Sequence, residues 1–131
     1  MNRRQPISTL MQRPVNSAGF DDTLAAVRAQ MSAKNLSWLP VVEANGTPLG
    51  VISATDLLRL HAEGKDPDTT RAWQLCSYKP LCVTPDTALG EVARRMVEQH
   101  IHHVAVVDAT GLVGVVSSLD FVRSFATPAP D

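Results

Sequence analysis

The chain of 131 residues contains two copies of one sequence unit. A shift of 65 positions superposes identical residues of the two halves, which in the first half are Leu10, Asp21, Leu24, Val27, Met31, Val41, Val42 and Gly46. After a one-residue deletion in the second copy the shift becomes 64, and the matching residues of the first copy are Gly50, Val51, Ser53, Asp56 and Arg59. A repeat of this length means that one supersecondary unit is built twice. Two equivalent units must therefore account for nearly the whole chain.

Each copy contains a helix followed by two strands and a second helix. In the first copy, Asp22 or Thr23 can cap a helix whose apolar residues recur at helical spacing up to about Asn35. In the second copy, residues 85–87 open the equivalent helix, which we expect to end near His100. The second helices are predicted over residues 54–61 and 118–125.

The strands are predicted from short apolar runs that are rich in valine. Residues 38–42 and 103–107 form the first run of each copy, and residues 49–52 and 112–116 form the return run. Turns at Asn45-Gly46 and Thr110-Gly111 join them into hairpins. Residues 16–18 and 81–83, upstream of each first helix, are expected to add a third strand. The unit is then β-α-β-β-α.

The predicted fold class is α+β, with two β-α-β-β-α repeats. One such unit leaves a sheet face bare, so we expect the two repeats to pack face to face about a pseudo-twofold axis. The first repeat, with the N-terminal segment, takes residues 1–61, and the second takes residues 72–126. Residues 62–71 have the composition of a linker, and residues 127–131 that of a frayed tail.

Composition excludes several classes of partner. The formal net charge of −1 comes without a cationic patch, which argues against nucleic acid. No apolar run is long enough for a membrane span, and the start of the chain lacks the apolar core of a signal peptide. Two cysteines are too few for a secreted disulfide framework. We therefore expect a soluble cytoplasmic protein that contacts neither nucleic acid nor membrane.

The chemistry is concentrated in a segment of the form Gly-x-x-Ser-x-x-Asp, which both copies carry where a strand gives way to a helix. Ser53 and Asp56 belong to the first copy, and Ser117 and Asp120 to the second. A helix N-terminus stabilises a phosphate, to which the serine hydroxyl can add a hydrogen bond, and a carboxylate can accept both hydroxyls of a ribose. The same spacing also resembles a capping box, which only satisfies backbone donors. From these residues alone, ligand binding and capping are about equally favoured.

Several motifs resemble those of tandem CBS-domain proteins. They are Leu39-Pro-Val-Val, the helix start at Pro85-Asp-Thr-Ala-Leu, and the run from Val106 to Asp120; the resemblance extends from about Ile7 to Phe125. It implies a regulatory module that binds an adenosyl small molecule in clefts between the repeats, with adenine nucleotides of the AMP, ADP and ATP class favoured over S-adenosylmethionine or NAD.

The resemblance also assigns roles to individual residues. Ser53 and Ser117 would contact phosphate, and Asp56 and Asp120 would contact ribose. Adenine would lie against the strand that precedes the first helix of each copy. The residues carried over for that role are Ser17, Ala18, Cys82 and Val83.

The two copies differ ahead of their first hairpin strand. The second copy has His102 and His103, where members of the family that bind phosphate often place a basic residue, and the first copy has Ser37 and Trp38. The two clefts are therefore expected to differ in affinity or in ligand. A metal site that includes these histidines is disfavoured, because no cysteine or carboxylate accompanies them at ligand spacing.

Two further hypotheses stay open at this point. In one, the chain is a pure interaction module whose motifs are only helix caps; a homodimer is expected with or without a ligand. In the other the chain is an enzyme, which the sequence does not favour because it has no phosphate-binding Gly-rich loop and no nucleophile elbow. We expect no catalytic cofactor. The effector protein that would respond to the module is unknown and is expected to be a separate chain.

Overall fold

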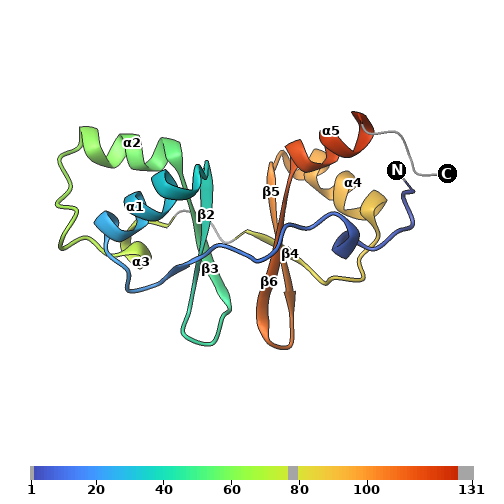
Figure 1. Cartoon of the computed structure of the whole chain (residues 1–131), viewed down its shortest axis with the longest axis horizontal. Coiled ribbons are helices and arrows are strands. Elements are labelled where there is room, and N and C mark those ends of the chain that lie inside the picture. The colour runs from blue at the N-terminus through green and yellow to red at the C-terminus, as the bar shows by residue number, and fades with distance from the viewer. Residues whose placement is uncertain (1, 77–79, 127–131) are drawn as a thin grey trace. The chain divides into compact units, whose positions relative to one another are not determined.

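The chain folds into two compact units, which the computed structural model describes over residues 2–76 and 80–126. The unit that we call the first unit comprises Asn16–Pro80. The second unit comprises Leu81–Asp131 together with the N-terminal segment Met1–Val15. The N-terminal segment, blue in Figure 1, thus belongs in space with the second repeat.

The first unit carries a three-stranded sheet in the order β1-β2-β3, with β1 parallel and β3 antiparallel to β2. Its helices lie to one side of the β2–β3 hairpin (Figure 1). Its elements are β1 (Ala18–Gly19), α1 (Leu24–Lys34), β2 (Trp38–Val42), β3 (Pro48–Ser53), α2 (Ala54–Ala62) and α3 (Ala72–Leu75).

The second unit repeats this topology in the order β4-β5-β6. Its elements are the 3-10 helix η1 (Ile7–Thr9), β4 (Leu81–Val83), α4 (Leu89–Gln99), β5 (His103–Asp108), β6 (Gly111–Ser117) and α5 (Ser118–Ala126). The α+β class with two β-α-β-β-α repeats is therefore confirmed. The strand expected at residues 16–18 begins only at Ala18, and η1 and α3 were not predicted because neither is long enough to show helical periodicity. Among the residues described, no helix is both long enough and apolar enough to span a membrane.

The first helix of each repeat begins and ends where local chemistry requires. Thr23 caps α1, and its hydroxyl oxygen accepts a hydrogen bond of 3.1 Å from the N–H of Ala26. Asn35 and His100 end α1 and α4 in the left-handed conformation, each with φ of 54°, and their N–H groups bond back into the last turn. The ends at Asn35 and His100 confirm the sequence prediction, whereas α4 begins at Leu89, later than the predicted opening at residues 85–87.

The cap residue of α4, Ala88, offers no side-chain acceptor to the first N–H groups of the helix. The N-terminal segment supplies the acceptors instead. The carbonyls of Gln5 and Arg3 accept from the N–H groups of Leu89 and Gly90 at 2.8 and 2.9 Å. In the first unit, residues 67 and 70 supply the equivalent carbonyls to α1. The segment upstream of each repeat therefore completes the unit formed by the other repeat.

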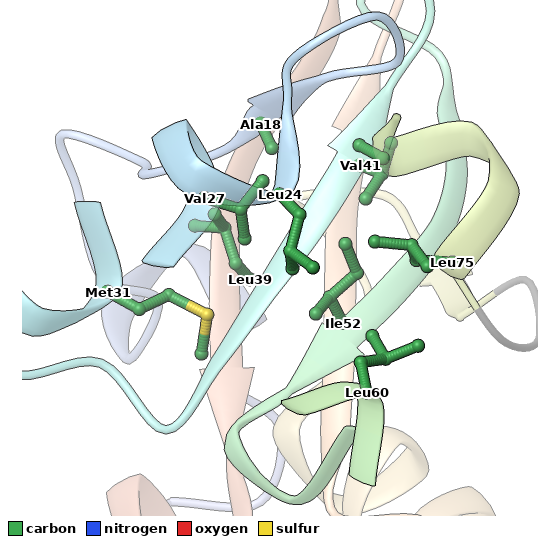
Figure 2. Packing of buried hydrophobic residues seen from close by; sticks show 10 residues of the cluster. Ala18, Leu24, Val27, Met31, Leu39, Val41, Ile52, Leu60 and Leu75 are labelled. Carbon is green, nitrogen blue, oxygen red and sulfur yellow. The ribbon is translucent and has the colours of Figure 1, made fainter. Parts of the chain in front are cut away.

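Each unit encloses a hydrophobic cluster between its helices and one face of its sheet. In the first unit, Leu39 and Ile52 lie opposite each other on β2 and β3 and are fully buried (Figure 2). The rest of that cluster is Ala18, Leu24, Val27, Met31, Val41, Leu60, Ala72 and Leu75. The second cluster is Ile7, Val83, Leu89, Val92, Met96, Val104, Val106, Val116 and Phe121. Repeat-equivalent positions thus build both cores.

Candidate functional site

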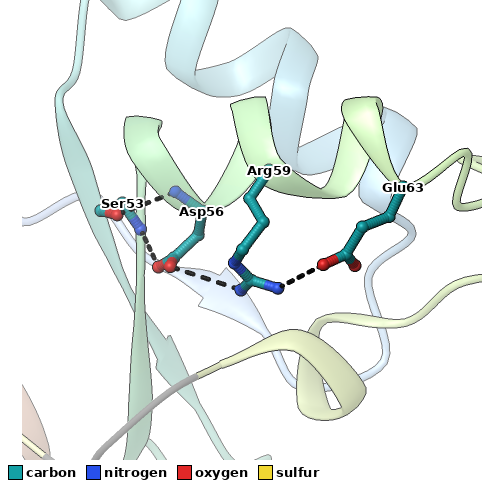
Figure 3. Close-up of polar contacts among 4 residues, drawn as sticks. All are labelled: Ser53, Asp56, Arg59 and Glu63. Atoms are coloured by element: carbon teal, nitrogen blue, oxygen red, sulfur yellow. Dashed lines mark hydrogen bonds and ion pairs between the residues drawn. The ribbon is translucent and has the colours of Figure 1, made fainter.

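The first Gly-x-x-Ser-x-x-Asp segment lies at the junction of β3 and α2. Ser53 is the cap residue of α2, and its Oγ accepts from the N–H of Asp56 at 3.1 Å. In return, Oδ2 of Asp56 accepts from the N–H of Ser53 at 2.8 Å (Figure 3). The capping box that the spacing allowed is therefore formed.

An arginine one turn further along α2 faces the same carboxylate. Arg59 lies 3.6 Å from Oδ1 of Asp56 and 3.4 Å from Oε1 of Glu63 (Figure 3). Arg59 and Asp56 are three positions apart and thus form an ion pair on one face of the helix. Its energetic contribution is small, because the guanidinium is half exposed and surface pairs contribute about 0–1 kcal/mol.

The second segment has the same cap and a different environment. Oδ2 of Asp120 accepts from the N–H of Ser117 at 2.8 Å, and Oγ of Ser117 accepts from the N–H of Asp120 at 3.2 Å. Here Oδ1 of Asp120 also accepts from Nε2 of Gln12 at 2.7 Å, and the residue is only 8% exposed. The second carboxylate is thus buried under the N-terminal segment.

Capping leaves some hydrogen-bonding capacity at each helix start. Each serine Oγ acts as an acceptor in the cap, so its hydroxyl hydrogen stays available as a donor. The N–H groups of Ala54 and Ser118 are already bonded to the carbonyls of Ser37 and His102. The next N–H groups, those of Thr55 and Leu119, belong to the first turn of α2 and α5, where N–H groups have no partner within their own helix. Each junction can therefore offer one hydroxyl and one N–H to an anion.

Trp38 and His103, at which the two copies differ, occupy equivalent positions in the two sheets. Trp38 lies directly opposite Ser53, and His103 lies directly opposite Ser117. Directly opposite side chains share a sheet face, and alternation along the strands puts these pairs on the face away from the core residues Leu39 and Val104. Each motif serine therefore has a different neighbour in the two units.

His103 is electrically neutral at neutral pH. Burial and the nearby His102 lower the pKa of His103 from its usual 6.5 to about 4, against a smaller raising effect of Asp120. His102 itself is exposed. The second motif therefore has a neutral imidazole beside its serine, while the first has an indole.

Comparison with known families places these features in a wider context. The family model described as CBS domain matches residues 7–63 and again residues 72–127. The chain belongs to the CBS domain family. It carries two CBS repeats, as the sequence resemblance implied.

Solved CBS domain pairs have the same fold as this chain. The CBS domain of a membrane protein from Sphaerobacter thermophilus is 25% identical, with a TM-score of 0.81 and coverage of 92% of this chain and 88% of the other. A CBS domain pair in complex with 5′-methylthioadenosine and S-adenosyl-L-methionine is 23% identical, with a TM-score of 0.80 and coverage of 93% and 96%. Both likenesses establish the fold of the pair.

The curated relatives are longer proteins. The gamma-3 subunit of the 5′-AMP-activated protein kinase from Sus scrofa is 32% identical over 99 residues, which are 70% of this chain and 19% of that subunit. The first curated relatives are matched over 63%, 32% and 19% of their own lengths. This chain therefore spans less than two thirds of each of them.

Of the four residues expected to line an adenine site, Cys82 and Val83 lie on β4, Ala18 lies on β1, and Ser17 directly precedes β1. Cys82 is half-buried and pairs with Ala105 of β5, which places it on the same sheet face as His103. Ser17 is half-buried, and its carbonyl accepts from Nε2 of Gln30 at 3.2 Å. Ala18 and Val83 are members of the two cores, at 0% and 4% exposure. Their side chains are therefore directed into the protein.

Gln12 is the site residue that the sequence did not reveal. Its contact with Asp120 joins residues that are 108 positions apart, and no motif connects them. The repeat alignment gives no signal either, because its conserved positions begin at Leu10 and resume only at Asp21. Over residues 2–76 and 80–126, no three histidine, cysteine or acidic side chains converge as a metal site.

Proposed function

We propose that this CBS pair is a regulatory module that binds an adenine nucleotide of the AMP, ADP or ATP class through its Ser-x-x-Asp junctions. The observation that carries the proposal is the first junction, where a hydroxyl donor and an incompletely used carboxylate lie together at a helix start. Oδ1 of Asp56 meets only Arg59 among the described residues, at 3.6 Å, which is longer than a hydrogen bond. That oxygen can accept from a ribose hydroxyl.

The charges of the junction orient the ligand. A phosphate beside the Asp56 carboxylate would be repelled, so the ribose lies against Asp56 and the phosphate lies toward the hydroxyl of Ser53 and the N–H of Thr55. Arg59 offsets part of the negative charge of Asp56. The capping contacts are compatible with this role, because they hold Ser53 and Asp56 in place without using the hydroxyl hydrogen.

The relatives support an adenosine-containing ligand. One solved CBS pair of the same fold is in complex with 5′-methylthioadenosine and S-adenosyl-L-methionine. One curated relative is the gamma-3 subunit of a protein kinase that is named as activated by 5′-AMP. These three ligands all contain an adenine base on a ribose, and the ribose hydroxyls can donate hydrogen bonds to a carboxylate. The choice of nucleotide over S-adenosylmethionine depends on the phosphate contacts at Ser53.

Regulation requires that the ligand favour one arrangement of the protein over another. The proposed output is a change read by a separate effector protein, without a chemical reaction on the nucleotide. The chain therefore acts as a binding module and not as an enzyme.

A thermal-shift panel with AMP, ADP, ATP, NAD and S-adenosylmethionine tests this function. A ligand at about a hundred times its Kd adds about 2.7 kcal/mol to the free energy of unfolding. Asp56→Ala should abolish the shift. Glu43→Ala removes an exposed carboxylate at the opposite end of β2 and should leave the shift intact. A panel in which no compound raises the midpoint, or a shift that survives Asp56→Ala, contradicts the proposal.

A ligand-free homodimer is the second candidate function, and one surface favours it. Helices α4 and α5 border an apolar hollow of about 460 Å³, next to which Val97, Val122 and Phe125 are 75%, 56% and 61% exposed. Exposed apolar clusters of this kind mark interaction sites. Sedimentation equilibrium of the unmodified chain and of Val97→Glu separates the two: a dimer that the substitution dissociates, without any nucleotide binding, favours this candidate.

A further inference from the structure

The N-terminal segment follows the second motif from its glycine to its aspartate. The N–H of Gln12 donates to the carbonyl of Val115 at 2.9 Å in an isolated antiparallel bridge. Beside it, Met11 packs so closely on Gly114 that a Cβ added there would lie 2.6 Å from the methionine Sδ. The side chain of Gln12 then reaches Asp120. The segment therefore covers the chemistry of this motif within the second unit itself.

Gln12 takes the acceptor that a ribose would use. Its amide donates to Oδ1 of Asp120 at 2.7 Å, while Oδ2 is bonded to the N–H of Ser117. An amide N–H and a ribose hydroxyl are both hydrogen-bond donors, so they compete for the same oxygen. The Gln12 amide donates to a charged carboxylate, and Asp120 is only 8% exposed, so displacement of the Gln12 side chain by a ligand is costly. The side chain of Asp56 is 20% exposed, and its Oδ1 has only the longer contact with Arg59 among the residues described.

We propose that Gln12 determines which motif binds: it closes the second motif to ribose and leaves Asp56 as the ribose site, so that one chain binds one adenosine ligand. This inference rests on the function proposed above and goes beyond it by assigning the site and the stoichiometry. A ligand at the second motif must first break the Gln12–Asp120 bond, which weakens its affinity by about tenfold or more relative to an open carboxylate.

The repeat supplies a matched substitution. A shift of 65 positions carries Gln12 of the first copy onto Ser77 of the second copy, which lies outside the described residues. Gln12→Ser therefore introduces the residue that the sequence of the other copy has at the aligned position. A serine side chain reaches its polar atom two atoms sooner than glutamine and cannot span the same distance to Asp120.

The substitution should leave the fold intact. Gln12 is exposed, and the segment is anchored by other groups, including the fully buried Ile7, whose N–H donates to the carbonyl of Thr87 at 2.7 Å. The backbone bond of residue 12 to Val115 does not depend on its side chain. The variant therefore tests the amide contact and not the presence of the segment.

Isothermal titration with AMP measures the stoichiometry directly. The unmodified chain is expected to bind one AMP and to lose it in Asp56→Ala. Gln12→Ser is expected to bind two, and the double variants Gln12→Ser/Asp56→Ala and Gln12→Ser/Asp120→Ala one each. A merely structural role of Gln12 would change stability and could not add a site.

The outcomes separate this inference from the function on which it rests. Binding with the same stoichiometry in the unmodified chain and in Gln12→Ser overturns the role of Gln12 and leaves the proposed function standing. Two AMP molecules on the unmodified chain overturn it equally. No binding by either protein, with both folded by circular dichroism, overturns the proposed function and the inference together.

Discussion

The two motif aspartates should contribute very different amounts to stability, although they occupy equivalent positions. Replacement by alanine at Asp56 or Asp120 removes the same cap bond from the same helix position, so the loss of the cap and the change in helix propensity cancel in the comparison. Asp120→Ala also removes the 2.7 Å bond from Gln12 to a buried carboxylate, which is worth about 1.5–3 kcal/mol. Beyond the cap, and among the residues that the structure describes, Asp56→Ala removes only the exposed pair with Arg59, worth about 0–1 kcal/mol. Asp120→Ala should thus cost about 1–2 kcal/mol more.

Urea unfolding resolves a difference of this size. With a slope of about 2 kcal/mol per molar urea, the midpoint shifts of the two variants should differ by about 0.5–1 M. Both tryptophans, Trp38 and Trp73, belong to the first unit, so their fluorescence follows that unit, while far-UV circular dichroism follows both. Each variant is compared with the transition of its own unit. Equal shifts, within about 0.2 M at this slope, would refute the assignment of the Gln12 bond as a stabilising contact of the buried carboxylate.

Three further perturbations follow from the geometry. Because the pKa of His103 is lowered, the unfolded chain binds a proton at this residue below pH 6.5, whereas the native chain does so only near pH 4. Stability should therefore fall as the pH falls from 6.5 to 4, and His103→Gln should flatten that part of a profile of melting temperature against pH. An NMR titration midpoint of His103 near 6.5 would contradict this explanation. Gly114→Ala places a Cβ 2.6 Å from Sδ of Met11 and should cost about 1–3 kcal/mol, which Met11→Ala should largely restore in the same urea assay; failure of that rescue would contradict the contact. Thr23→Ala should cost about 1 kcal/mol through loss of the α1 cap and Thr23→Ser much less, whereas equal losses would show that the hydroxyl is not the cause.

Most of the fold could be predicted from the sequence because the determinants are local and occur twice. The strand β2 and the start of the helix at Thr23 follow from a valine-rich run and a capping residue, and the structure places both where those signals predict. Asn35 and His100 end their helices in the left-handed conformation at equivalent positions. Periodicity, caps and turns act over a few residues, so a duplicated pattern gives two independent readings of the same signal.

The candidate site was predictable only where its residues belong to the motif. Ser53 and Asp56 bond to each other because a cap acts across three positions, and the same spacing placed Arg59 beside the carboxylate. The contact of Gln12 with Asp120 depends instead on which unit the N-terminal segment joins. That choice is made by tertiary contacts, such as the burial of Ile7, which no local pattern encodes.

The exchange of upstream segments gives the two copies of a duplicated motif different environments. The residues that form the cap, at the serine and the aspartate, lie inside the repeat and stay matched, because any change there costs a helix its first hydrogen bonds. Gln12, which donates to Oδ1 of Asp120, comes from outside the second repeat, on a segment held mainly by its backbone and by Ile7. Substitution at that position therefore alters one carboxylate without disturbing either cap. If Gln12 closes one site, the asymmetry of this CBS pair resides in the exchanged segment, and variation there would change the number of bound ligands while both motifs stay the same.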